Sequence, residues 1–291
     1  MKKYLLFLTW ACTGLFSQVF AQKTVNVSNI NELIQAIAPN KIIKLKANKF
    51  ILSNLNINIS NPHVNLEPVE DGFRVEIKGV SNLRIEGASE RKSKIISNSR
   101  YAPILVFIDC DNISIDNIEA GHGSSKGICK GEVLAFHNSK KIILTNTVLF
   151  GSGTEGLLLN NCTESRFDNV TIRGCTQGIL TIRNSSQIDF INCRFTDNRQ
   201  FDLINIFDSE KITLSNCLID LNRSGDGSPH NIYALFNAPL TLGMHDPILT
   251  LTKCTIEDNY CQYFCRSGNA VKLVDCQLDN NIFEKGYNSH K

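Results

Sequence analysis

The chain has 291 residues, 42% of them hydrophobic, and its 30 basic and 28 acidic side chains leave a formal net charge of +2. This length allows one elongated domain or two compact ones. A net charge so close to zero gives no reason to predict nucleic acid or an anionic membrane surface as a partner.

Residues 1–21 have the pattern of a secretory signal peptide. Two lysines precede an apolar run, and Val19-Phe20-Ala21 has the small residues of a signal-peptidase cleavage site. A lipoprotein anchored through Cys12 is an alternative, although the residues before Cys12 match a lipobox poorly. No other stretch is apolar over the roughly 18 residues that a spanning helix needs. We therefore expect residues 22–291 to form one domain that is secreted, periplasmic or at the cell surface.

Residues 29–37 are predicted to form a short helix. Asn29 and Glu32 have the spacing of a capping box, and apolar residues follow at helical intervals. The end of a stacked sheet leaves an unpaired strand edge that invites aggregation, so we expect this helix to cap it. Residues 42–53 supply the first strands.

An eight-residue pattern then recurs along the chain, and an asparagine usually occupies its fifth position. It is seen in ISIDNIEA (113–120), IILTNTVL (142–149), SRFDNVTI (165–172), IDFINCRF (188–195), ITLSNCLI (212–219), LTLTKCTI (249–256) and VKLVDCQL (271–278). The fifth positions are Asn117, Asn146, Asn169, Asn192, Asn216, Lys253 and Asp275, with steps of 29, 23, 23, 24, 37 and 22 residues. A fixed period of this length indicates a solenoid.

A second turn precedes each central asparagine by about eight residues. It is formed by His137-Asn138-Ser139, Asn160-Asn161-Cys162, Arg183-Asn184-Ser185 and Phe207-Asp208-Ser209. Such short strands bury their inner face only by stacking on copies of themselves. Asparagine tolerates the left-handed conformation that a sharp corner needs, and its amide can bond to its counterpart in the next coil. The repeat therefore predicts a parallel β-helix with an asparagine ladder.

These corners, over roughly residues 24–282, resemble the right-handed parallel β-helix superfamily that includes pectate lyases and polygalacturonases. The resemblance implies an all-β fold, a right-handed parallel β-helix of nine to eleven coils with a short N-terminal capping helix. It identifies a fold and no reaction. In this superfamily substrates usually lie along a groove on one sheet.

Ten cysteines remain when Cys12 is set aside. In an exported chain this number suggests disulfides. The alternative favours a stack of buried thiols, because four of the cysteines occupy a repeat position that elsewhere holds Ile, Thr or Val; they are Cys193, Cys217, Cys254 and Cys276. Cys261 and Cys265, in a polar segment, are predicted to bond to each other or to a loop partner.

The candidate binding residues follow from strand alternation. If Phe136, Leu159, Ile182 and Ile206 face inward, the outward residues are Val133, Ala135, His137, Leu158, Asn160, Ile179, Thr181, Arg183, Leu203, Asn205 and Phe207. His137, Asn160, Arg183 and Phe207 then form a column that could bond to and stack on a sugar, with Asn205 beside it. This column lacks paired carboxylates, and ordinary solvated strand positions are the alternative.

The 29-residue step contains the loop 120–132, which adds His122 and Lys126 as predicted binding residues. Gly121-His122-Gly123 looks like the Gly-His-Gly of polygalacturonase-type hydrolases, but no Asp-Asp pair accompanies it. The chain beyond residue 21 also has no tryptophan for a pectate-lyase Trp-x-Asp-His motif. His122 with Cys129 is a weak zinc pattern, and Ser124 and Ser125 have no identifiable base.

The 37-residue step contributes a second candidate rim, from 222–231 and 237–246. It carries Arg223, Asp226, His230, His245 and Asp246. Four coils, or about 19 Å, separate the two rims. His122 and His230 are therefore not expected to share a reacting atom.

We predict an exported monomer that binds a polysaccharide or another extended carbohydrate along one sheet and its loop rim, with no cofactor and no metal ion. The competing class is an enzyme, a polysaccharide lyase or glycoside hydrolase whose active site leaves no linear motif, and calcium ligands gathered by stacking stay open in that class. A structural spacer without a small ligand is the third hypothesis.

Overall fold

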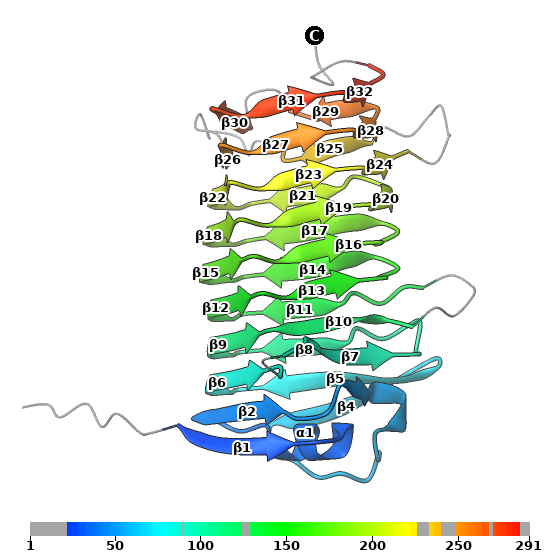
Figure 1. The fold of residues 1–291 in the computed structure, drawn as a ribbon, viewed down its shortest axis with the longest axis vertical. Coiled ribbons are helices and arrows are strands. Elements are labelled where there is room, and N and C mark those ends of the chain that lie inside the picture. The colour runs from blue at the N-terminus through cyan, green and yellow to red at the C-terminus, as the bar shows by residue number, and fades with distance from the viewer. Residues whose placement is uncertain are drawn as a thin grey trace, which may run out of the picture.

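The computed structural model describes residues 22–88, 90–123, 129–225, 233–239, 248–267 and 270–285. Within these ranges the chain winds into a column of short strands stacked coil upon coil (Figure 1). Most coils contribute one strand to each of three long sheets. The predicted signal peptide, residues 1–21, lies outside the described residues.

Sheet A has ten strands in the described ranges: β1 (Lys23–Val27), β2 (Lys41–Leu45), β6 (Ser81–Glu86), β9 (Asp111–Asp116), β12 (Lys140–Thr145), β15 (Thr163–Asp168), β18 (Ser186–Ile191), β22 (Glu210–Ser215), β26 (Leu249–Thr252) and β30 (Val271–Val274). Sheet B comprises β3 (Lys49–Ile51), β7 (Ser93–Ser97), β10 (Ile118–His122), β13 (Val148–Phe150), β16 (Thr171–Arg173), β19 (Arg194–Thr196), β23 (Leu218–Asp220), β27 (Thr255–Glu257) and β31 (Gln277–Asp279).

Sheet C comprises β4 (Val64–Val69), β5 (Gly72–Lys78), β8 (Leu105–Ile108), β11 (Leu134–His137), β14 (Glu155–Asn160), β17 (Gly178–Arg183), β21 (Ile204–Phe207), β25 (Ala234–Asn237) and β29 (Tyr263–Cys265). The short sheet D comprises β20 (Arg199–Gln200), β24 (Arg223–Ser224), β28 (Tyr260–Cys261) and β32 (Ile282–Phe283). Among the named strands the pairing is parallel except in the hairpin β4–β5. One coil thus runs from sheet C to sheet A to sheet B, as β11, β12 and β13 do.

The corners of the stack have the predicted left-handed backbone. The seven repeat positions from Asn117 to Asp275 all have φ between 49° and 55°. The second turns share this conformation, for example at Asn138 and Asn184. Side-chain bonds join neighbouring coils: Asn169 Nδ2 donates to Asn146 Oδ1 at 2.8 Å, whereas the amide of Asn192 donates to Asp168 at 3.1 Å. The ladder is therefore confirmed, with aspartate taking some of its rungs.

The N-terminal helix α1 (Ile30–Ala36) has the predicted capping box. The Asn29 side chain accepts from the Glu32 backbone N–H, and Glu32 accepts from the Ser28 N–H at 2.6 Å. Ile30, Leu33 and Ile34 are buried against the first coil at the N-terminal end (Figure 1). The chain then forms the 3-10 turn η1 (Leu52–Asn54). No helix in the described ranges is long and apolar enough to cross a membrane.

The interior is a continuous column of aliphatic and aromatic side chains. Phe167 and Phe190, one coil apart, stack with ring centres 4.6 Å apart. The ten cysteines of the described residues are free thiols; eight of them are buried, and Cys129 and Cys276 are partly exposed. This agrees with the predicted packing role of the four repeat cysteines. The predicted bond of Cys261 or Cys265 is wrong, because both thiols point into the core, where burial raises their pKa to about 11.

A second ladder, which the sequence pattern did not predict, lies inside the core where sheet B meets sheet D. It is formed by Asn198, Asn222, Asn259 and Asn281. Asn222 is fully buried; its amide donates to Phe195 O at 2.8 Å and Asn259 Oδ1 at 2.9 Å. Its own Oδ1 accepts from the Asn198 backbone N–H and side-chain amide, both at 3.0 Å. Each amide thus satisfies backbone groups that a tight interior turn leaves unpaired.

Replacement of Asn222 by alanine should lower the free energy of unfolding by at least about 2 kcal/mol, since several buried partners lose their bonds at once. Denaturant titration of the purified protein measures this. Asn54→Ala is the control, because Asn54 is exposed and its φ is not positive. Equal stability of the two variants would contradict a structural role for the inner ladder.

Candidate functional site

A column of polar and aromatic side chains runs along the outward face of sheet C. His137, Asn160, Arg183 and Phe207 end the neighbouring strands β11, β14, β17 and β21 and are paired in register. Asn160 Nδ2 lies 3.5 Å from His137 Nδ1. The guanidinium carbon of Arg183 lies 4.8 Å from the centre of the Phe207 ring. The structure therefore brings these four candidate residues together.

The next column on the same face is largely covered. Val106, Ala135 and Thr181 point outward, yet they are only 3%, 2% and 5% exposed. Leu158, which lies between Ala135 and Thr181 as predicted, is partly exposed. Asn205 continues this column; it donates to Asp202 O at 3.1 Å and accepts from Asn237 at 2.9 Å. We call this column, from Val106 to Asn205, the floor.

Strand alternation failed at the start of β11, β17 and β21. Val133, Ile179 and Leu203, which were predicted to face outward, are completely buried. A bulge is the reason: the backbone N–H groups of Ile179 and Leu180 both donate to Leu203 O, at 2.6 and 3.3 Å. Two consecutive residues then turn inward, so the residue before them moves to the outer face.

This bulge brings a third column to the surface, and it is acidic. Glu132, Glu155 and Asp202 occupy equivalent positions before β11, within β14 and before β21, and Gly178 lies between the last two. Glu132 and Glu155 are stacked in consecutive coils, as the bond from Val133 N to Glu155 O shows. The sequence pattern predicted no pair of carboxylates beside the His137 column. That prediction is wrong, because Glu132 and Glu155 lie on the same face. We call the surface formed by Glu132, Glu155, the floor and the His137 column the sheet C track.

The two glutamates have unusual protonation. Burial raises the pKa of Glu155, and hydrogen bonding to Thr181 only partly offsets it. Burial also raises the pKa of Glu132, and the adjacent charge of Glu155 adds to the rise. Two carboxyl groups in neighbouring coils whose ionisation is opposed by burial form a pair that releases its protons above the usual carboxyl range.

Asp202 differs from the glutamates because it is fully engaged by its surroundings. Its carboxylate accepts from Ala234 N at 2.7 Å and Asn237 Nδ2 at 3.1 Å, and it pairs with Arg266 at 2.8 Å. These bonds hold together the upper coils of sheet C. We therefore assign Asp202 to structure and not to the track.

The track ends, toward the N-terminus, in a charged group on β5. Glu76 accepts from Arg74 and Lys78, both at 2.7 Å, and from Asn65 at 3.0 Å. Burial lowers the pKa of His137, and the charge of Arg74 lowers it further. His137 is therefore a neutral imidazole at pH 7, able to accept or donate one hydrogen bond.

The remaining candidates lie elsewhere. His122 ends β10 in sheet B and is 7% exposed, with Nε2 2.9 Å from Ala102 O. It does not share a face with His137. Lys126, Ser124 and Ser125 lie outside the described residues, as do Asp226, His230, His245 and Asp246 of the second predicted rim. In the described part of the chain, no three His, Cys, Asp or Glu residues are grouped as a metal site.

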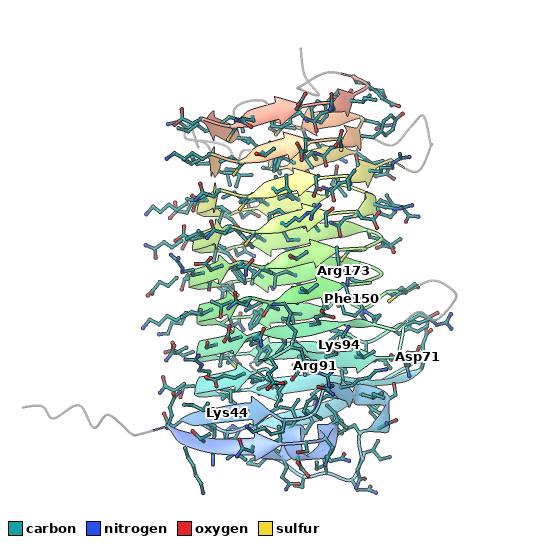
Figure 2. The ribbon with its side chains drawn as sticks, in the orientation of Figure 1. Lys44, Asp71, Arg91, Lys94, Phe150 and Arg173 are labelled. Carbon is teal, nitrogen blue, oxygen red and sulfur yellow. The ribbon has the colours of Figure 1, made fainter. Side chains whose placement is uncertain are left out.

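The outward face of sheet B offers a useful contrast. Lys94 pairs with Glu119 at 2.8 Å, and Arg173 lies 5.1 Å from the ring centre of Phe150. Figure 2 shows Lys94, Phe150 and Arg173 on this side of the stack. This face repeats the arginine–phenylalanine contact of sheet C.

Comparison with known proteins agrees with this fold. A family model described as "Right handed beta helix region" matches residues 130–234, which include the whole track from Glu132 to Phe207. No curated protein matches the sequence significantly. Together with the stacked parallel sheets, the match confirms the predicted fold class, a right-handed parallel β-helix.

A solved structure shares this architecture. A pectate lyase (pelN) from Paenibacillus sp. 0602 is 12% identical, with 88% of this chain and 78% of that chain covered and a TM-score of 0.62. The surface adhesin PfbA of Streptococcus pneumoniae is 11% identical, with 92% and 82% covered and a TM-score of 0.41. At such identities the likeness is one of fold.

The raised pKa of Glu155 predicts a pH dependence of stability. An acid whose pKa is raised by folding stabilises the fold at pH values below its unfolded pKa, about 4.3, and this contribution is lost as the pH rises through the folded value. The variant Glu155→Gln cannot ionise at this position. The difference between its melting temperature and that of the wild type should therefore shift in its favour as the pH rises from about 4 to about 7.

Glu76→Gln is the matched control on the same face. Although burial opposes ionisation of Glu76, hydrogen bonds from Lys78 and Asn65 outweigh it and lower its pKa. Its contribution is present above the unfolded pKa and is lost as the pH falls. Glu76→Gln should therefore lose stability relative to wild type at neutral pH and recover it in acid. If the stability of both variants relative to wild type changed in the same direction with pH, the opposite pKa shifts of Glu155 and Glu76 would be contradicted.

Proposed function

We propose that this chain is an exported monomer that binds an extended polysaccharide along the sheet C track. The carrying observation is the register of three columns: acidic residues on one side, a largely covered floor, and His137, Asn160 and Arg183 on the other. Strands recur about every 4.8 Å along the stack. A polymer lying along the stack axis therefore meets similar groups again and again.

The chemistry of the track suits sugar hydroxyl and carboxylate groups. Arg183 supplies several N–H donors, Asn160 both donates and accepts, and Phe207 offers an apolar ring. The likeness in fold to a pectate lyase supports a polysaccharide as the ligand. The lysines and apolar run of residues 1–21 support export.

The binding proposal predicts that replacing Arg183 by alanine weakens retention of a bound polysaccharide by about tenfold or more, because a hydrogen bond to a charged group is worth roughly 1.5–3 kcal/mol. Affinity gels containing uronic-acid or neutral polysaccharides measure this. Combination with His137→Ala should abolish retention.

Arg173→Ala is the control, because Arg173 makes the same kind of contact with a phenylalanine on sheet B. Its retention should equal that of the wild type. If no polysaccharide in the panel retards the wild type, or if the two arginine variants behave alike, binding along the sheet C track is wrong.

The stacked glutamates favour a second function, cleavage of the bound chain. A protonated Glu155 could donate its proton to the leaving oxygen of a glycosidic bond, while an ionised Glu132 accepts a proton from water or from a sugar carbon. Raised carboxyl pKa values are the property that such a proton donor needs at neutral pH. Hydrolysis would release reducing ends; elimination from a uronic acid would also give an unsaturated product.

If the track is an active site, Glu155→Gln should lower product formation by about 100-fold or more, while retention in affinity gels persists. Absorbance of unsaturated products and a reducing-end assay follow the two reactions. Unchanged product formation in Glu155→Gln would show that Glu132 and Glu155 do not catalyse the cleavage. Absence of product with retention intact leaves the binding function, and absence of both leaves a structural spacer.

A further inference from the structure

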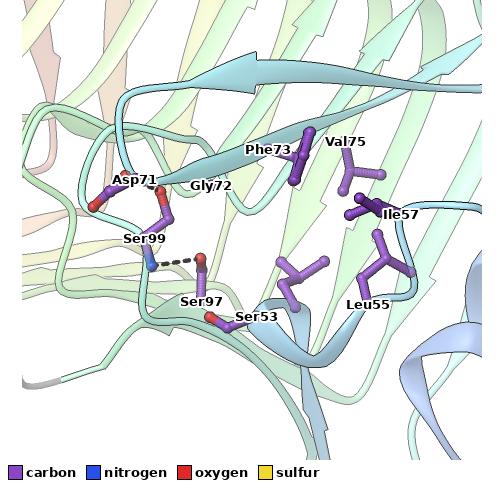
Figure 3. A pocket seen from close by; sticks show the side chains of 10 residues that line it. Ser53, Leu55, Ile57, Asp71, Gly72, Phe73, Val75, Ser97 and Ser99 are labelled. Atoms are coloured by element: carbon purple, nitrogen blue, oxygen red, sulfur yellow. Dashed lines mark hydrogen bonds between the residues drawn. The ribbon is translucent and has the colours of Figure 1, made fainter.

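A small pocket lies where the hairpin β4–β5 meets η1 and the segment after β7. Its volume is about 170 Å³, and its walls come from Leu52, Ser53, Leu55, Ile57, Asp71, Gly72, Phe73, Val75, Ser97 and Ser99. Figure 3 shows the apolar side chains gathered at one end and Asp71 with the serines at the other. In Figure 2, Asp71 marks this place at the edge of the stack away from sheet A. The pocket is smaller than the roughly 300 Å³ at which sites for drug-sized ligands begin.

The apolar end is unusually open to solvent. Ile57 is 57% exposed and Phe73 is 37% exposed, which makes them two of the most exposed large apolar side chains among the described residues. Leu55 and Val75 complete this wall. An exposed aromatic ring beside a concave surface is a common means of holding a flat, partly apolar ligand.

The polar end has hydrogen-bonding capacity left over. Ser97 Oγ accepts from Ser99 N at 3.1 Å, and Ser53 Oγ accepts from Asn98 N at 3.2 Å. Neither hydroxyl hydrogen has an acceptor among the described residues, so each can still donate. These two hydroxyl groups can therefore donate hydrogen bonds to acceptor atoms of a ligand.

Asp71 supplies an acceptor and fixes the sign of the charge. Ser99 Oγ donates to Asp71 Oδ1 at 2.5 Å, and Arg100 N donates to Oδ2 at 2.7 Å. Burial works against ionisation, but these bonds outweigh it and hold the pKa of Asp71 below its usual value. Arg100 Nε also lies 3.9 Å from Oδ2, but Arg100 does not line the pocket, so Asp71 is the charged side chain in its wall. The carboxylate is thus ionised at neutral pH, attracts hydroxyl donors and disfavours a carboxylate placed beside it.

We propose that this pocket binds one neutral pyranose ring, whose apolar face packs on Phe73 and whose hydroxyl groups bond to Asp71, Ser97 and Ser53. A sugar ring combines one apolar face with a rim of groups that donate and accept, which is what the two ends of the pocket require. A uronic acid would bring a second negative charge beside Asp71. The site therefore selects neutral sugars over their uronic acids.

This site is distinct from the sheet C track. Phe73 and Val75 point to one side of β5, whereas Arg74 and Glu76 point to the other, because alternate residues of a strand face opposite ways. The two surfaces thus share a strand but no side chain. The pocket can bind a sugar whether or not the track holds a polysaccharide.

Saturation-transfer NMR on the full-length mature protein tests the proposal, with methyl glucoside and methyl galactoside as neutral probes and glucuronate and galacturonate as their acidic counterparts. The neutral probes should bind with weak affinity, and their uronic acids should bind at least about fivefold more weakly. Phe73→Ala should weaken neutral-probe binding at least about fivefold, whereas Phe73→Tyr should preserve it.

Tyr260→Ala is the matched control, since Tyr260 is 40% exposed and lies on sheet D, away from the pocket. It should bind like the wild type, and Arg183→Ala should also leave the monosaccharide signal unchanged. No transfer to either neutral probe, equal binding of the uronic acids, or full binding by a folded Phe73→Ala variant would each overturn the site. Loss of polysaccharide retention in Arg183→Ala with the monosaccharide signal intact separates the fate of the track from that of the pocket.

Discussion

The left-handed corner, repeated in register, is the constraint on which the structure depends. The chain turns from one sheet to the next at residues with positive φ, and the side-chain amides there bond to the coil above or below. This fixes the start of every strand relative to its neighbours. Residues about 23 positions apart, such as His137 and Asn160, consequently become neighbours on one surface. The track is a product of that register.

Much of the fold could be predicted because corners have a strict chemical requirement. Few side chains tolerate positive φ, so Asn117, Asn146 and Asn169 reveal the period directly. Once the period is known, the column from His137 to Phe207 follows from counting. The helix at the N-terminus was equally accessible, since its capping box and apolar stripe are local signals.

What could not be predicted depends on single-residue shifts. Strict alternation places Glu132 and Glu155 inward, but both precede a pair of consecutive buried residues and so lie on the outer face, because one residue of slip reverses every side chain. The inner ladder includes Asn222, which the sequence placed in a candidate loop rim, and Asn198, for which no role was predicted. The pocket at Phe73 unites segments that no repeat relates. Such features arise from tertiary packing and leave no linear pattern.

The most direct test of the account is a crystal structure of the mature protein soaked with an oligosaccharide that it retains. The account predicts a chain of sugar rings lying along the stack axis over Ala135 and Thr181, between the Glu155 carboxyl group and the Arg183 guanidinium. Density confined to sheet A or sheet B, or a sheet C surface that stays bare at saturating ligand, would contradict it.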